Sequence, residues 1–237
     1  MTSFILKLIG IVSMLFDHSS LSFVGHFSFY NYIGRLAFPI FAFQISQGYL
    51  HTKDIKKYLL RLFVFACISQ IPFMMFFDSI GEKYILNVIF TLLLGVICII
   101  CYDKLKIKFL SFSCIIFLCT IAQLIKVDYG AFGVVSTFLF YFFYNLYNRK
   151  DISFRKQLFY KCLMCICFFI ITLLYYLKNI ILYPVVVLTY IKIIIFTCMP
   201  LLFILMYNGK QGPKIKYLFY IFYPLHLFLL WLVYYIK

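Results

Sequence analysis

Two adjacent titratable residues, Asp17 and His18, lie well inside the apolar run at residues 4–24. A charged group near the centre of a bilayer costs roughly 2.5–3.5 kcal/mol on insertion scales, so such residues usually face the interior of a helix bundle and often mark function. Polar residues in or at the ends of other apolar runs include Arg35, Asn87, Asp128 and His226. We expect these six residues to form the catalytic site. The alternative is that they only hold helices together through buried polar pairs.

The composition is that of an integral membrane protein rather than a soluble domain. Of 237 residues, 65% are hydrophobic and only 12% are charged, and the mean hydropathy is +1.02. Runs long enough to cross a bilayer recur at residues 4–24, 29–50, 55–77, 84–101, 108–126, 129–147, 158–177, 183–206 and 215–236. We therefore predict an all-α, polytopic bundle of about nine transmembrane helices that forms one domain over residues 1–237. The eighth run contains two prolines, and residues 178–190 could be re-entrant.

The basic residues predict the orientation of this bundle. If the N-terminus is cytoplasmic, sixteen Lys and Arg residues fall in or beside inner segments and four in or beside outer ones. This alternation is typical of the positive-inside rule and also places the C-terminus outside. The net charge of +15 is thereby explained by orientation and contact with the anionic lipid bilayer, and we expect no nucleic-acid partner.

Orientation and helical rise together predict a polar pocket in the outer half of the membrane. At about 1.5 Å per residue, Asp17 and His18 lie in the outer half, and Arg35 lies about 9 Å below the outer surface. Asn87 and Asp128 open their helices at the outer face. His226, in the run 215–236, lies about 15 Å along its helix, near the midplane.

Lys7 and His18 are eleven residues apart, which is three helical turns plus about 20°. Both side chains therefore project from one face of the first helix, about 16 Å apart along its axis. A ligand with a phosphate-rich head and a long flexible arm, entering from the cytosol, suits this spacing. Acyl-coenzyme A has that shape. Taken alone, Lys7 is better explained as an ordinary lysine extending to the membrane surface.

More candidates for phosphate contacts lie at the predicted cytoplasmic mouth: His51, Lys53, Lys57 and Arg61. Next to Thr52 and Asp54, His51 also fits a capped turn that begins a helix. The nine cysteines lie within or at the edges of apolar runs, where a buried thiol behaves as a small hydrophobe. We expect no metal site.

Eight segments in order resemble the TraX family. They are "LKLIGIVSMLFDH" (6–18), "IGRLAFPIFAF" (33–43), "GYLHTKDIKKYLLRL" (48–62), "ISQIPF" (68–73), "NVIFTLLLG" (87–95), "DYGAFGV" (128–134), "YNGKQG" (207–212) and "LFYIFYPLHL" (218–227). The type member of that family is associated with N-acetylation of F-pilin. The family is distantly similar to membrane acyltransferases that carry a basic residue, ten intervening residues and a His, the spacing of Lys7 and His18. Gln47 and Gln70 depart from positions that are often acidic in the family.

The resemblance implies an acetyl- or acyltransferase in the bacterial cytoplasmic (inner) membrane that takes its acyl group from acetyl-CoA. His18 would act as general base or carry the acyl group itself, and Arg35 and Asn87 would stabilise oxyanion charge. Asp17 would pair with Arg35, and His226 would be a second acid/base or an anchor. The acceptor stays open between a pilin-like protein N-terminus and an envelope amine or hydroxyl. Alternatives are a proton-coupled transporter and a non-catalytic scaffold of envelope or pilus assembly.

Overall fold

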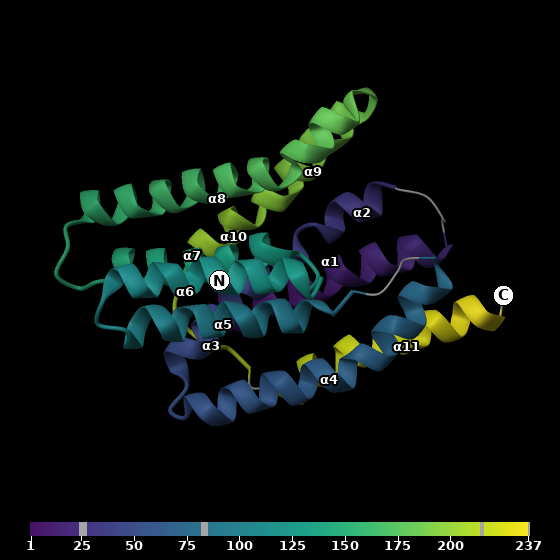
Figure 1. Cartoon of the computed structure of the whole chain (residues 1–237), viewed down its shortest axis with the longest axis horizontal. Helices are drawn as coiled ribbons and strands as arrows, with labels where there is room; N and C mark the ends of the chain where they lie inside the picture. The colour runs from purple at the N-terminus through teal and green to yellow at the C-terminus, as the bar shows by residue number, and fades with distance from the viewer. Residues whose placement is uncertain (24–27, 82–84, 214–215, 237) are drawn as a thin grey trace.

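The computed structural model describes residues 1–23, 28–81, 85–213 and 216–236, with side chains of the last segment described from residue 220. In this part of the chain the regular structure is helical, apart from an isolated bridge between Leu86 and Val127. The elements are α1 (Ser3–Phe23), α2 (Phe29–Gly34), α3 (Ala37–His51), α4 (Ile55–Ser79), α5 (Val88–Lys104), α6 (Lys108–Leu124), α7 (Gly130–Tyr147), α8 (Phe154–Leu182), η1 (Pro184–Val186), α9 (Val187–Cys198), α10 (Pro200–Leu205) and α11 (Lys216–Ile236) (Figure 1). The prediction of an all-α protein is confirmed.

The run 29–50, expected to be one helix, is two. Its first part, α2, ends at Gly34, and α3 begins at Ala37 after a turn at Arg35 and Leu36. Pro39 explains the break, because it has no N–H to bond the carbonyl four residues earlier and its ring crowds that carbonyl. In the first turn of a new helix the missing N–H has no cost.

The run 183–206 is also interrupted, and its beginning differs from the prediction. Residues 178–182 were expected to lie beyond the helix predicted at 158–177. They instead continue that helix, α8, to Leu182. A short 3-10 turn then starts at Pro184, and a further break precedes Pro200, between α9 and α10. Both prolines stand at the first positions of their elements, where proline is tolerated. After Leu182 the chain thus turns back, and α9 packs against α8 to form a helical hairpin (Figure 1).

Five segments among the described residues are long and apolar enough to cross a membrane by themselves. They are Ser3–Phe23, Ile55–Ser79, Gly130–Tyr147, Phe154–Leu182 and Pro184–Leu205. Two shorter apolar helices, Lys108–Leu124 and Tyr220–Ile236, flank the bundle. The count of nine crossings stays a prediction.

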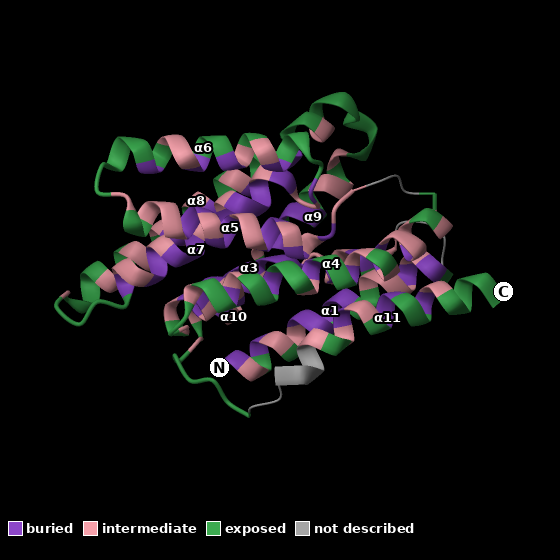
Figure 2. Cartoon of the chain, turned by 60° about the horizontal axis from the view of Figure 1, so that its bottom comes forward, coloured by how far each residue is buried: buried purple, intermediate pink, exposed green. Residues whose placement is uncertain are grey.

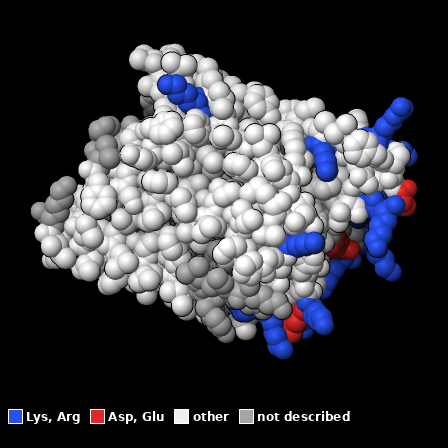
Figure 3. Space-filling model, turned by 180° about the vertical axis from the view of Figure 1, so that it is seen from behind, with Lys and Arg blue, Asp and Glu red and all other residues white. Residues whose placement is uncertain are grey.

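The outer surface of the bundle is apolar, as a lipid-facing surface must be. Large hydrophobic side chains are exposed along α4, α6, α8 and α11, for example Ile71, Ile116 and Ile181, and Figure 2 shows exposed residues along the outside of these helices. Lys and Arg side chains gather at one end of the face seen in Figure 3, and most of the rest of that face is uncharged. This separation of charge is the pattern that the positive-inside prediction requires.

The middle of the bundle depends on close contact between α5 and α7. A Cβ added to Gly95 would lie 2.6 Å from Cβ of Thr137, and one added to Gly133 would lie 2.3 Å from Cγ2 of Thr91. Each helix therefore offers a glycine to a threonine of the other, with four-residue spacing on both. In a membrane, where apolar side chains gain little by leaving lipid, small residues of this kind drive helix association.

We predict that Gly95→Val or Gly133→Val lowers the thermal stability of the detergent-solubilised protein, because the added methyl groups must force the two backbones apart. Overpacking of this kind typically costs about 1–3 kcal/mol. The measurement is the midpoint of thermal unfolding, followed by loss of monodisperse protein. Cys67→Val, at an exposed position of α4, is the control. Equal midpoints for all three variants and the parent would contradict the assigned packing.

Candidate functional site

Two histidines from opposite ends of the chain form a hydrogen-bonded pair. His18 on α1 places Nδ1 2.9 Å from Nε2 of His226 on α11, and the two ring planes differ by only 4°. The other ring nitrogen of His226, Nδ1, lies 2.8 Å from the carbonyl oxygen of Phe222. His226 is 4% exposed, whereas His18 is partly exposed. The rings of Phe76 and Phe77 on α4 pack against His18. The pair is thus held between three helices.

Arg35 occupies the turn between α2 and α3, close enough to Asp17, Asp128 and His18 to interact with them electrostatically. Gly34 makes the approach to α1 possible, since a Cβ there would lie 2.3 Å from Cβ of Asp17. Three of the predicted residues, Asp17, His18 and Asp128, therefore lie around the guanidinium of a fourth, Arg35, and His226 joins them through His18. The depth of this cluster in the membrane stays a prediction.

Asp17 has a different partner from the one expected. Its carboxylate accepts a hydrogen bond of 2.8 Å from Nδ2 of Asn31. In the described part of the chain no Asp17–Arg35 ion pair forms within 4.0 Å, and the ion pair present there joins Lys57 to Asp54. The predicted direct pairing is therefore wrong, although the two charges remain close. Arg35 keeps a buried Nε that has no hydrogen-bond partner among the described residues.

The backbone fixes Asp128 at the start of α7. Its N–H donates to the carbonyl of Leu86 at 2.8 Å, and its own carbonyl accepts from Oγ1 of Thr91. The next residue, Tyr129, has a left-handed φ of 61° and stacks on Phe38. These contacts direct the segment before α7 toward Arg35.

Asn87 does not belong to the cluster. Its Nδ2 donates to the carbonyl of Ala66 and to Oε1 of Gln70, both at 2.8 Å, and its Oδ1 accepts from the N–H of Ile89 as the cap of α5. Both amide protons are therefore used, and none is free to stabilise an oxyanion. We correct its role from catalysis to capping. Gln70, noted as a departure from the family pattern, supports this cap.

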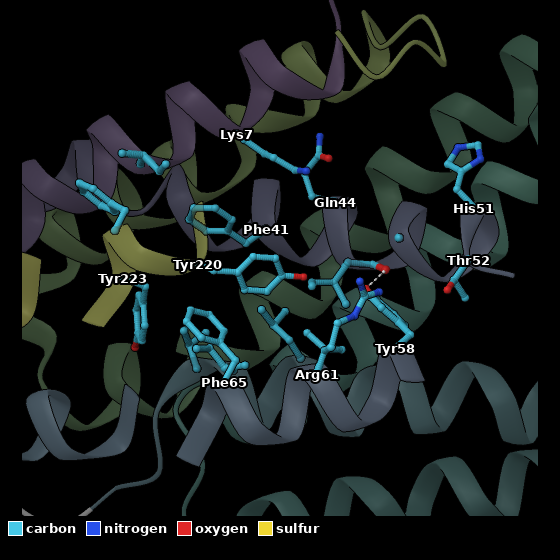
Figure 4. Close-up of a pocket in the computed structure, with 18 of the residues that line it drawn as sticks. Lys7, Phe41, Gln44, His51, Thr52, Tyr58, Arg61, Phe65, Tyr220 and Tyr223 are labelled. Atoms are coloured by element: carbon cyan, nitrogen blue, oxygen red, sulfur yellow. Dashed lines mark hydrogen bonds between the residues drawn. The ribbon is translucent and has the colours of Figure 1, made fainter. Parts of the chain in front are cut away.

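A cavity of about 460 Å³ lies on the side of the bundle where the predicted cytoplasmic loops are (Figure 4). Residues of α1, α3, α4, α5 and α11 line it. Four of the five predicted phosphate-binding residues are among them: Lys7, His51, Lys53 and Arg61. The fifth, Lys57, is 82% exposed, forms a 3.4 Å ion pair with Asp54 and lies outside the described lining. Asp54 caps α4 by accepting from the N–H of Lys57, so the predicted capped turn is present after His51, which ends α3.

The loop that contains "YNGKQG" ties the start of α1 to this cavity. The N–H groups of Ser3 and Phe4 donate to the carbonyls of Lys210 and Gln211, and Gln211 lines the cavity. Gly212 has a φ of +74° and leaves no room for a Cβ beside Thr2. The motif therefore shapes the cavity wall near the N-terminus.

The end of the cavity farthest from the predicted cytoplasmic loops stops one helical turn short of the histidines. Met14 and Phe222 line it, and each stands four residues before a histidine of the pair, about 6 Å along its helix. Neither histidine is among the described residues of the lining. The ring of Phe222 stacks on that of His226 with centroids 4.6 Å apart. Lys7 thus lines the cavity, and His18, eleven residues later on the same helix, lies just beyond the end of the cavity.

Sequence reasoning missed Gln44. It is 7% exposed and lines the cavity, and Figure 4 shows it beside Lys7. Its Oε1 accepts from Oγ of Ser3 at 2.6 Å, and its Nε2 has no partner among the described residues. This leaves an amide donor for a ligand. The sequence signal that could have identified Gln44 is an amide in the middle of an apolar run. Within the described residues no group of three or more metal-ligating side chains occurs.

Comparisons with known proteins agree with the resemblance seen in the motifs. The family model described as "TraX protein" matches residues 3–234. A relative described as "Probable fimbrial assembly protein FimC, serogroup H1", from Dichelobacter nodosus, is 30% identical over 97% of this chain and 94% of its own length. No solved structure matches the chain. The family match spans almost every described helix, from α1 to α11, so this chain belongs to the TraX family.

Proposed function

We propose that this protein is an acyltransferase of the bacterial inner membrane that takes an acyl group, such as acetyl, from cytosolic acyl-CoA and transfers it to an acceptor in the outer half of the membrane. The observation that carries the proposal is the position of the cavity. It begins among cationic side chains at one end of the bundle and ends one turn from the His18–His226 pair.

The cavity suits the two chemically different parts of coenzyme A. Lys53, Arg61 and His51 lie at its mouth, where they can contact phosphates as charges and hydrogen-bond donors. Deeper in, Lys7 and the amide nitrogen of Gln44, which has no partner among the described residues, can bind the polar groups of the pantetheine arm. The volume falls within the roughly 300–1,000 Å³ typical of small-molecule sites. The arm would occupy it and the nucleotide would remain at the mouth.

His18 is the residue best placed to act on the acyl group. As general base it would take the proton of an acceptor amine or hydroxyl while the acceptor attacks the thioester carbonyl, and the sulfur of CoA would leave and take up a proton. In the other route His18 attacks first and then passes the acyl group on. Arg35 lies near enough to His18 to stabilise negative charge on the carbonyl oxygen.

The thioester has to pass Met14 and Phe222 to reach His18. Methionine is unbranched and has several rotatable bonds, so it adapts easily to a passing chain. Phe222 lies on α11, whose Pro224 removes one helical hydrogen bond close to the pair. These two side chains would therefore separate the cavity from the histidines until the arm enters.

The relative's description as a probable fimbrial assembly protein supports a protein subunit of a surface fibre as the acceptor. A subunit that waits in the membrane before assembly would present its exposed end at the level of His18 and Arg35. Acylation there would remove a positive charge if the acceptor group is an amine.

His18→Ala is expected to abolish transfer, because no other described side chain of the cluster offers a free imidazole nitrogen at this level. The measurement is release of CoA thiol from acetyl-CoA by membranes that contain the protein and its natural envelope, with labelled acetyl followed into the envelope fraction. Cys67→Val, at an exposed position of α4 outside the cavity lining, is the control. Undiminished transfer by a correctly inserted His18→Ala protein would refute the mechanism.

Arg61→Ala and Lys7→Ala are expected to raise the KM for acetyl-CoA about 10- to 150-fold and to change kcat less, because these side chains bind the donor rather than the reacting atoms. A lost charge-assisted hydrogen bond is worth about 1.5–3 kcal/mol. Lys57→Ala removes a cation from the same helix but outside the cavity lining, and its KM should be unchanged. Equal increases in KM for Lys57→Ala and Arg61→Ala would mean that only general surface charge attracts the donor.

A further inference from the structure

The two ring nitrogens of His226 are both occupied, and this decides where its protons are. Its Nδ1 faces the carbonyl oxygen of Phe222 at 2.8 Å. A carbonyl oxygen can only accept a hydrogen bond, so Nδ1 must carry a hydrogen. In a neutral imidazole with Nδ1–H, the other nitrogen, Nε2, has a lone pair.

The hydrogen bond between the rings then has one direction. Because Nε2 of His226 accepts, Nδ1 of His18, 2.9 Å away, must donate. The ring centroids are 5.1 Å apart and the planes are within 4°. The difference between the centroid and nitrogen distances is close to two ring radii, so the rings lie edge to edge in nearly one plane. The N–H of one ring therefore points along the lone pair of the other.

We infer that His226 is a positioning residue, anchored to the Phe222 carbonyl, that accepts the Nδ1 hydrogen of His18 and so holds His18 with the lone pair of Nε2 free for the acceptor. The base role of His18 rests on the proposed function, whereas the hydrogen-bond chain stands without it. His226 itself is buried and has no free nitrogen, so it cannot reach a substrate.

A carboxylate commonly orients a catalytic histidine in this way. Asp17 is not used for it here, because its carboxylate is bonded to Asn31 and adjacent residues on a helix point about 100° apart. A neutral imidazole gives the same orientation without placing another charge in the bundle. It sets the tautomer of His18 but adds little stabilisation to a charged His18.

Two substitutions of His226 separate orientation from simple packing. In His226→Gln the side-chain oxygen can take the place of Nε2 and accept from His18. In His226→Asn the shorter amide can reach only the place of Nδ1, so the bond to Phe222 is kept and the bond to His18 is lost. We expect transfer by the Gln variant within about tenfold of the parent and a loss of about 10- to 100-fold in kcat for the Asn variant. The KM for acetyl-CoA should be unchanged in both.

A second measurement needs no acyl transfer. The chain has only four histidines, so 15N NMR of histidine-labelled protein can resolve their tautomers, with His18→Gln and His226→Gln spectra for assignment. The expected result is protonated Nδ1 and unprotonated Nε2 on both residues, with His18 reverting toward the Nε2–H tautomer in His226→Asn.

The outcomes distinguish the two claims. A proton on Nε2 of His18 in the parent protein, or equal kcat for the Asn and Gln variants, would overturn the role of His226. The expected tautomers in a protein that transfers no acyl group would leave the hydrogen-bond chain intact and refute the proposed function.

Discussion

The bilayer imposes the constraint on which the rest of this structure depends: a polar group inside it must find its partner within the protein. The histidine pair, the Arg35 cluster and the Asn87 cap each meet this requirement in a different way. Asn87 is fully bonded and so can only be structural. His18 and Arg35 each keep a nitrogen for which no hydrogen bond is assigned among the described residues. Positions that keep such a nitrogen, Gln44 of the cavity among them, are where a ligand can act.

The same constraint explains why the site has two parts. Cations can be placed freely only at the ends of the bundle, where water is near, so cationic side chains such as Lys53 and Arg61 gather at the cavity mouth. The reacting groups must sit deeper, where water is excluded and electrostatic interactions are stronger. Under the proposed function, a donor with a long arm would join the two levels.

Much of this could be predicted from the sequence. The length and spacing of apolar runs predict an all-helical membrane bundle, and the eleven-residue step from Lys7 to His18 follows from helical geometry alone. The interruption of the run 183–206 by its prolines was expected, whereas the break around Arg35 was not predicted, since proline marks a break without fixing its exact place. Pairing between His18 and His226, 208 residues apart, depends on how α11 packs on α1, which a pattern local to one helix does not contain. The capping role of Asn87 likewise depends on Ala66 and Gln70 of a neighbouring helix.

The central claim is that the cavity admits acyl-CoA independently of the chemistry beyond it, and binding tests this directly. Equilibrium dialysis of labelled acetyl-CoA against the purified protein in detergent measures it without an acceptor. The account predicts saturable, one-to-one binding that unlabelled CoA displaces, with the same Kd for His18→Ala and a Kd raised by Lys7→Ala. Absence of saturable binding to the folded protein would contradict the account and favour a transporter or a scaffold.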